Sequence, residues 1–183
     1  MKFVIIIFSF FSMAPFAYAN AGVPMIFITL PDMVIGLIPI IFIESYVLFK
    51  NLKKTFKICF KTSAIANTVS TLLGIPVTWL LLVVLQQLTG GGRAYGMDTP
   101  SKKLLSVTWQ APWLIPYEKE LYWMIPSATL VLLIPFFFAS WFIEYQLSKR
   151  KLPDVENAVI KKSFFLANLV SYILLALVVL IKL

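Results

Sequence analysis

The chain contains four long apolar stretches, and short segments rich in Lys separate the first from the second and the third from the fourth. Lipid offers the backbone no hydrogen-bond partners, so a stretch of about 20 apolar residues crosses a bilayer as an α-helix. The 183 residues are 60% hydrophobic and only 13% charged, whereas about 25% are charged in ordinary soluble domains. The sequence therefore predicts an all-α membrane protein whose residues 20–183 form one domain of four transmembrane helices. The predicted spans are residues 31–49, 62–88, 127–146 and 163–181.

Residues 1–19 have the features of a secretory signal peptide. Lys2 supplies the positive start, residues 3–13 are apolar, and an A-x-A cleavage site ends at Ala19. We expect cleavage after Ala19, and an uncleaved N-terminal anchor is the alternative, because about 17 apolar residues can just span a bilayer. Either outcome leaves Asn20 outside the cytoplasm, as expected for a bacterial-type protein of the plasma (inner) membrane.

The Lys and Arg residues concentrate in the segments between the first and second spans and between the third and fourth spans. Loops rich in Lys and Arg stay on the cytoplasmic side of a membrane. We therefore predict a multi-pass topology with both mature termini outside the cytoplasm. The net charge of +8 follows from this placement, so we expect a lipid bilayer as partner and no binding of nucleic acid. The residues concerned are Lys50, Lys53, Lys54, Lys57, Lys61, Lys149, Arg150, Lys151, Lys161 and Lys162.

The segments on the predicted outer side are apolar or aromatic. Pro31 suits the first turn of a helix, so we expect the first helix to begin there and residues 23–30 to form an apolar hook. Residues 93–122 contain Pro112 and Pro116, which exclude one regular helix. Aromatic rings favour the headgroup layer, so this segment is predicted to be interfacial, with a lipid or quinone site as the alternative to a plain aromatic belt. The predicted belt is Trp109, Trp113, Tyr117, Tyr122 and Trp123.

Two parts of the chain are similar to each other. Residues 65–70 read IANTVS and residues 166–171 read LANLVS, and each copy follows a span that ends in Ile-Glu and then a basic loop. The acids in question are Glu44 and Glu144. Both copies have the same orientation across the membrane, so the pattern predicts two tandem helical hairpins, a parallel internal repeat about an axis along the membrane normal.

The polar residues of the two copies fall at one depth in the membrane. Glu44 precedes Lys50 by six residues and Asn67 follows Lys61 by six, which places each about 9 Å deeper than the basic loop. Lipid cannot satisfy such groups, so they should point into the bundle and meet. The predicted polar intramembrane layer is Glu44, Asn67, Ser70, Glu144, Asn168 and Ser171. The small residues Ala66, Gly74 and Ala167 are predicted to pack helix against helix.

This polar layer has three interpretations. It can be a staple whose hydrogen bonds each contribute about 0.6 to 2 kcal/mol. Alternatively, Glu44 and Glu144 bind a proton or cation, because acids inside a membrane mark transport routes. In the third interpretation, the two acids reach water and loop lysines at the membrane border.

Enzymatic chemistry finds little support in the sequence. There is no His, and the single Cys59 can form neither an internal disulfide nor a metal site. We therefore expect no enzyme, no cofactor and no metal. The sequence favours a small non-enzymatic accessory or scaffold subunit, or a homo-oligomer, packed through the Glu/Asn layer against a membrane-protein partner or another copy. The alternative is a small transporter or an ion- or proton-conducting protein that uses Glu44 and Glu144.

Overall fold

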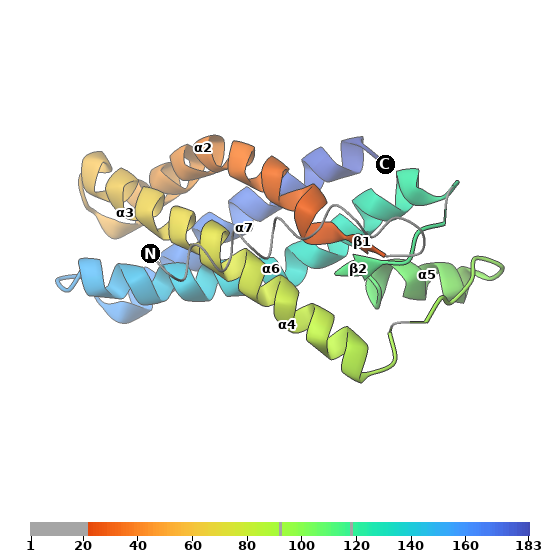
Figure 1. Ribbon diagram of the computed structural model, residues 1–183. Coiled ribbons are helices and arrows are strands. Elements are labelled where there is room, and N and C mark those ends of the chain that lie inside the picture. Colours follow the sequence, from red (N-terminus) through yellow and green to blue (C-terminus); the bar gives the residue numbers. More distant parts are fainter. Residues whose placement is uncertain (1–21, 92, 118) are drawn as a thin grey trace.

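The computed structural model describes residues 22–91, 93–117 and 119–183 (Figure 1). The predicted signal peptide, residues 1–19, lies outside the described residues. The elements follow in the order β1 (Val23–Pro24), α2 (Met25–Leu52), α3 (Phe56–Val69), η2 (Ser70–Gly74), α4 (Ile75–Leu88), α5 (Pro100–Thr108), β2 (Trp113–Leu114), α6 (Leu121–Lys151) and α7 (Asn157–Ile181). The element η2 is a single π-helical turn.

Four of the helical stretches in the described part of the chain are long and apolar enough to cross a membrane. They are α2, the continuous stretch of α3, η2 and α4, and then α6 and α7, with 28, 33, 31 and 25 residues. At about 1.5 Å per residue, each is longer than the hydrocarbon core of a bilayer, which is about 30 Å thick. The prediction of a mostly helical protein with four such helices is confirmed, and these helices are compatible with a multi-pass membrane protein.

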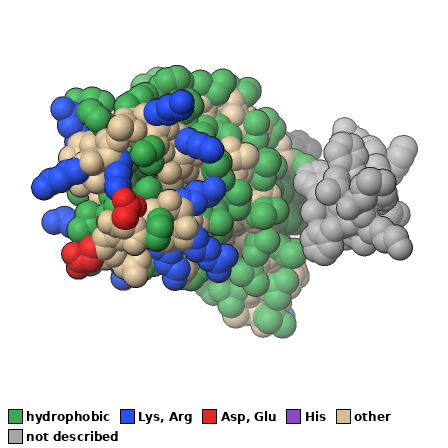
Figure 2. All heavy atoms as spheres, turned by 90° about the vertical axis from the view of Figure 1, so that its left-hand side faces the viewer, with side chains coloured by type: hydrophobic (Ala, Val, Ile, Leu, Met, Phe, Trp, Pro, Cys, Tyr) green, Lys and Arg blue, Asp and Glu red, His purple; other side chains and the backbone are tan. Residues whose placement is uncertain are grey.

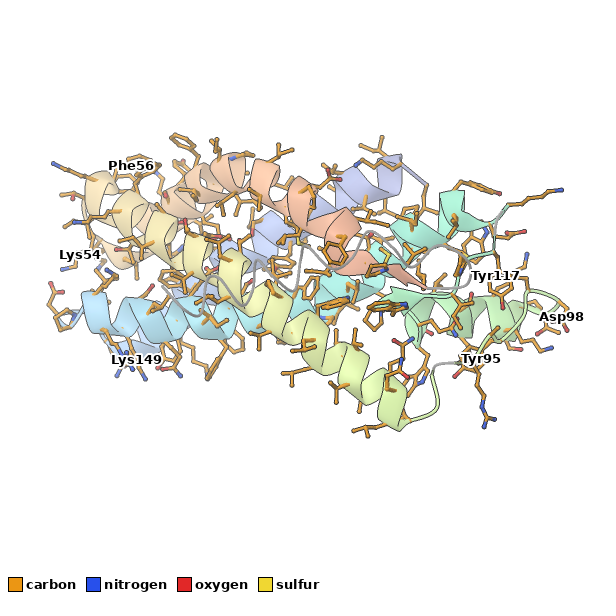
Figure 3. The ribbon with its side chains drawn as sticks, in the orientation of Figure 1. Lys54, Phe56, Tyr95, Asp98, Tyr117 and Lys149 are labelled. Atoms are coloured by element: carbon orange, nitrogen blue, oxygen red, sulfur yellow. The ribbon has the colours of Figure 1, made fainter. Side chains whose placement is uncertain are left out.

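The four long helices form two antiparallel hairpins that pack on each other. Helices α2 and α3 are joined by residues 53–55, and helices α6 and α7 by residues 152–156. Between the hairpins, α2 packs on α7, and α3 with η2 packs on α6. Both connecting loops lie at the same end of the bundle (Figure 1). Lys and Arg side chains surround this end (Figure 2), which is called the basic end below; Lys54 and Lys149 lie there (Figure 3).

The first long helix begins earlier than the sequence suggested. It starts at Met25, and Pro31 and Pro39 both lie inside it, so the predicted start at Pro31 and the predicted hook of residues 23–30 are wrong. The cause is a long-range contact. Val23–Pro24 pairs antiparallel with Trp113–Leu114, and the backbone N–H of Met25 donates to the carbonyl of Pro112 at 3.2 Å. This pairing fixes the start of α2.

The other long helices also extend beyond the predicted spans. Helix α3 begins at Phe56, α6 covers Leu121–Lys151, and α7 begins at Asn157. The basic residues at the loops continue the helices, since Lys and Arg are good helix formers. The segment between α4 and α6 is not one helix; it folds as α5 followed by β2. The short β1–β2 pair is the one addition to the predicted all-α fold in the described ranges.

Two hydrophobic clusters fill the bundle, one in each half. The cluster toward the basic end contains Leu48, Leu52, Cys59, Ala66, Leu152, Ile160, Phe164 and Ala167. The cluster in the opposite half contains Met25, Ile26, Met33, Ile75, Val107, Ala111, Leu114, Met124, Ala128, Leu132, Leu133 and Phe136. Along α2 and along α6, the polar residues Glu44 and Glu144 fall between the members of these two clusters. The bundle therefore has a buried polar level with apolar packing on both sides.

Candidate functional site

The buried polar level brings together all six residues of the predicted Glu/Asn layer. Glu44 comes from α2, Asn67 and Ser70 from the α3–η2 junction, Glu144 from α6, and Asn168 and Ser171 from α7. Residues three apart on a helix share one face, so each Asn-x-x-Ser unit aims its amide and its hydroxyl at the same space. Glu44, Glu144 and Asn168 are 0% exposed, and the other three are at most 5% exposed.

Each carboxyl group accepts one hydrogen bond from its own hairpin and one from the other hairpin. Glu44 accepts from Nδ2 of Asn67 at 2.6 Å and from Oγ of Ser171 at 2.7 Å. Glu144 accepts from Nδ2 of Asn168 at 2.8 Å and from Oγ of Ser70 at 2.9 Å. The amide donor is always local and the hydroxyl donor always comes from the opposite hairpin. The four hydrogen bonds therefore form a crossed network that joins the two hairpins.

The donors of this network are held in place by their own helices. Nδ2 of Asn67 also donates to the carbonyl of Ser63 at 3.1 Å, and Nδ2 of Asn168 donates to the carbonyl of Phe164 at 3.0 Å. The hydroxyl of Ser171 lies 3.0 Å from the carbonyl of Asn168, which gives it a second acceptor within reach. Such contacts one turn back along a helix fix the side-chain rotamers, so the network is pre-organised.

The carboxyl groups of Glu44 and Glu144 also lie close enough to influence each other electrostatically. Two carboxylates in contact inside a protein repel each other strongly, so they do not both carry a full charge unless a cation lies between them. The Asn and Ser donors are neutral; they orient the oxygens and leave the charge in place. Oδ1 of Asn168 is buried beside Glu144 and has no partner among the described residues. Among the described residues, the site is thus rich in oxygen acceptors and has no positively charged partner.

The turn that carries Ser70 departs from regular α-helix geometry. Ser70–Gly74 form the π-helical turn η2, a feature that is frequent at functional sites. The matching stretch around Ser171 lies inside the regular helix α7. A Cβ atom at Gly74 would lie 2.5 Å from Cδ1 of Ile143, so Gly74 lets η2 approach α6 closely. The other two predicted packing residues, Ala66 and Ala167, are buried in the cluster at the basic end.

A cavity of about 660 Å³ lies between α2, α6 and α7, in the half of the bundle opposite the basic end. Asp32, Tyr122 and Lys182 line its mouth, where Nζ of Lys182 pairs with Asp32 at 3.0 Å. Its inner end reaches Ile43 and Ser171. Because Ser171 donates to Glu44, one side chain separates the cavity from the carboxyl pair. The walls between mouth and inner end are mainly aliphatic.

The basic end of the bundle is closed. The apolar cluster around Leu48 and Phe164 fills it, and Lys54 forms an ion pair with Asp154, 100 positions away, that joins the two hairpin loops. The hydrogen bond from Lys54 holds the pKa of Asp154 below its usual range. Access to the carboxyl pair is therefore asymmetric, with a cavity on one side and packed side chains on the other.

The five residues of the predicted aromatic belt differ in how exposed their side chains are. Trp109 and Tyr122 are exposed, whereas the other three are half-buried and hydrogen-bonded or stacked within the chain. Trp113 stacks on Trp79, with ring centroids 5.9 Å apart, and Trp123 donates to Glu120. The hydroxyl of Tyr117, labelled in Figure 3, accepts from the backbone N–H of Gly96 at 2.8 Å. Much of the belt thus fastens the segment between α4 and α6 to the helices.

Sequence patterns did not indicate the cavity, and they did not indicate the contact in which the hydroxyl groups of Ser140 and Tyr172 lie 2.9 Å apart. A cavity depends on how neighbouring helices tilt, and helical spacing carries no signal for this. In the sequence, Tyr172 is marked only by its position after Ser171.

Comparison with protein-family models, curated proteins and solved structures finds no match for this chain.

Proposed function

We propose that this chain is a small non-enzymatic membrane transporter that binds a proton or a cation between Glu44 and Glu144. The observation that supports this most is the closeness of two fully buried carboxyl groups whose hydrogen-bond donors are neutral. A structural staple does not need acids here, because Gln side chains could accept the same hydrogen bonds from Asn and Ser. Two acids in contact make the packing depend on a proton or cation.

The asymmetric access to the pair supports the same proposal. A carrier that alternates between two sides of a membrane has its site open to one side and closed to the other in each state. Here the cavity approaches Ser171 from one side, and the second apolar cluster with the Lys54–Asp154 pair closes the other. With the basic loops in the cytoplasm, this conformation faces outward. The crossed contacts of Ser70 and Ser171 relate the two hairpins in the same way, which supports a parallel repeat.

A second candidate function is that of an accessory or scaffold subunit. It is favoured by α4, which leans away from α2 and α7 (Figure 1) and has an exposed apolar face. That face comprises Val77, Leu80, Leu81, Val84, Leu85 and Leu88. The six polar residues are hydrogen-bonded within one chain, so a partner helix or a second copy would dock on α4 and not through the Glu/Asn layer.

Infrared titration of the full chain in lipid tests the first candidate. Wild-type protein is expected to show a protonated-carboxyl band that changes with pH, or on addition of Na⁺, and that is lost in the Glu44→Gln/Glu144→Gln double variant. Asp98→Asn is the matched control, because Asp98 is exposed and pairs with Lys102 at 2.7 Å far from the site. A band that responds to neither pH nor Na⁺, in a protein that co-purifies with a stoichiometric partner, would favour the scaffold.

A further inference from the structure

We infer that the cavity between α2, α6 and α7 binds an amphiphilic organic cation, with its apolar body in the cavity and its charge against Ser171 and Glu44. This inference rests on the proposed function, because it names the substrate class of the same carboxyl pair. Three observations support it. They are the apolar chemistry of the walls, the position of Ser171 at the inner end, and the two buried carboxyl groups behind Ser171, whose described hydrogen-bond donors are neutral.

The walls of the cavity select an apolar molecule. The polar side chains on them are few, and the hydroxyls of Thr29 and Thr129 donate to carbonyls of their own helices, at 2.9 and 2.8 Å. Their protons are therefore not available to a ligand. The volume of about 660 Å³ falls within the range of about 300 to 1,000 Å³ that is usual for small-molecule sites. The aliphatic wall residues include Met33, Ile40, Ile43, Leu133, Leu175 and Val179.

The inner end of the cavity offers acceptors to a positive charge. The Ser171 hydroxyl has two acceptors in reach, Glu44 at 2.7 Å and the carbonyl of Asn168 at 3.0 Å. Rotation of its proton toward Asn168 releases a Glu44 oxygen from this hydrogen bond. Glu44 itself is fully buried behind Ser171, so an entering cation meets the Ser171 oxygen first. The cation then replaces the proton that the two carboxyl groups share, and this proton leaves to the solvent. The net charge of the occupied site is the same before and after this exchange.

Charge complementarity distinguishes this ligand from an ordinary lipid tail. A hydrocarbon chain would match the walls and would gain nothing from the acids behind Ser171. A cation gains from both, because the described groups that hydrogen-bond to the two carboxyls are neutral. The ion pair of Asp32 and Lys182 at the mouth carries no net charge and so does not repel an organic cation.

The test uses tetraphenylphosphonium as probe and the full chain in detergent, with binding followed by equilibrium dialysis. Gly36 lines the cavity, and a Cβ atom there would lie 3.9 Å from the nearest side chain, Ile40. Gly36→Leu should therefore place a side chain from α2 in the cavity without a clash in the helix packing. Leu81→Ala on the exposed face of α4 is the control. We expect saturable binding that weakens at acidic pH, and a loss of about tenfold or more in Gly36→Leu and in Glu44→Gln, with the control unchanged.

Binding that both variants leave intact, or equal displacement of the probe by an uncharged amphiphile, would overturn the inference. The infrared titration separates this failure from failure of the proposed function. If the carboxyl band still titrates in wild type and in Gly36→Leu but the cation does not bind, only the substrate class is wrong. If the wild-type band does not titrate at all, the carboxyl pair is not a transport site and both proposals fail.

Discussion

Ser171 on α7 donates a 2.7 Å hydrogen bond to Glu44 on α2, across 127 positions of sequence. Ser171 also lines the inner end of the cavity. This one contact therefore links an open space to a fully buried acid. Its counterpart, from Ser70 to Glu144 at 2.9 Å, starts from the first residue of the π-helical turn, and Ser70 does not line that cavity.

The two serines allow a matched comparison of structure and function. Ser171→Ala and Ser70→Ala each remove one donor from one carboxyl group, so each is expected to lower the free energy of unfolding by about 0.6 to 2 kcal/mol. Only Ser171→Ala should also change the binding of tetraphenylphosphonium. Thermal unfolding in detergent and equilibrium dialysis check the two effects. Equal changes in probe binding for both variants would contradict the role given to Ser171.

The crossing of the hydrogen bonds can be tested by double-mutant cycles. Ser171→Ala combined with Glu44→Gln should show a coupling energy in the range of about 0.5 to 3 kcal/mol, because these residues are in contact. Ser70→Ala with Glu144→Gln should behave in the same way. The measurement is denaturant unfolding of the single and double variants. A network paired within each hairpin would instead couple Ser171 to Glu144 and Ser70 to Glu44.

Gly74 should resist substitution where Gly36 does not. Gly74→Ala would place a Cβ atom 2.5 Å from Cδ1 of Ile143, so the end of this side chain must leave its rotamer, at a cost of about 0.5 to 1.5 kcal/mol. Gly36→Ala meets its nearest side chain at 3.9 Å and should be neutral, or stabilising by up to about 1 kcal/mol through helix propensity. Unfolding midpoints measure both. Partial rescue of Gly74→Ala by Ile143→Ala would attribute the loss to this contact.

The ion pair at the basic end should contribute to stability only above acidic pH. Because Lys54 lowers the pKa of Asp154 from its ordinary value of 3.8, folding favours the charged form. The contribution is thus present above pH 3.8 and is lost as the pH falls from there through the lower folded-state value. Asp154→Asn should lower the unfolding midpoint slightly near neutral pH, less at high salt, and not at all in strong acid. A difference that grows on acidification would contradict this sign.

The sequence was sufficient to predict the helices and the members of the polar layer. Each of the four apolar runs is longer than a bilayer requires, and this left few alternatives to four helices. The spacing of Glu44 and Asn67 from neighbouring lysines set a common depth, and lipid leaves acids and amides at that depth no partners except one another. What this spacing does not fix is the rotation of one hairpin against the other. It therefore left open which serine reaches which carboxyl group.

The errors of the sequence reading come from contacts between distant segments. Pro31 has the local features of a helix start, but the pairing of Val23–Pro24 with Trp113–Leu114 moves the start to Met25. The segment between α4 and α6, which supplies this pairing, is also held by Trp79, whose Nε1 donates to the carbonyl of Pro112 at 2.6 Å. The cavity likewise depends on the separation of α2, α6 and α7 in the half of the bundle opposite the basic end, which no local pattern encodes.

The most direct test of the carboxyl pair is infrared titration of the single variant Glu144→Gln beside wild type. If Glu44 and Glu144 act as one unit, the remaining Glu44 should titrate at a pH clearly different from that of the wild-type pair, because its neighbour no longer shares the proton. Glu44→Gln should shift the titration of Glu144 as well. Carboxyl bands that titrate at the same pH in wild type and in both single variants would show that the two acids are independent.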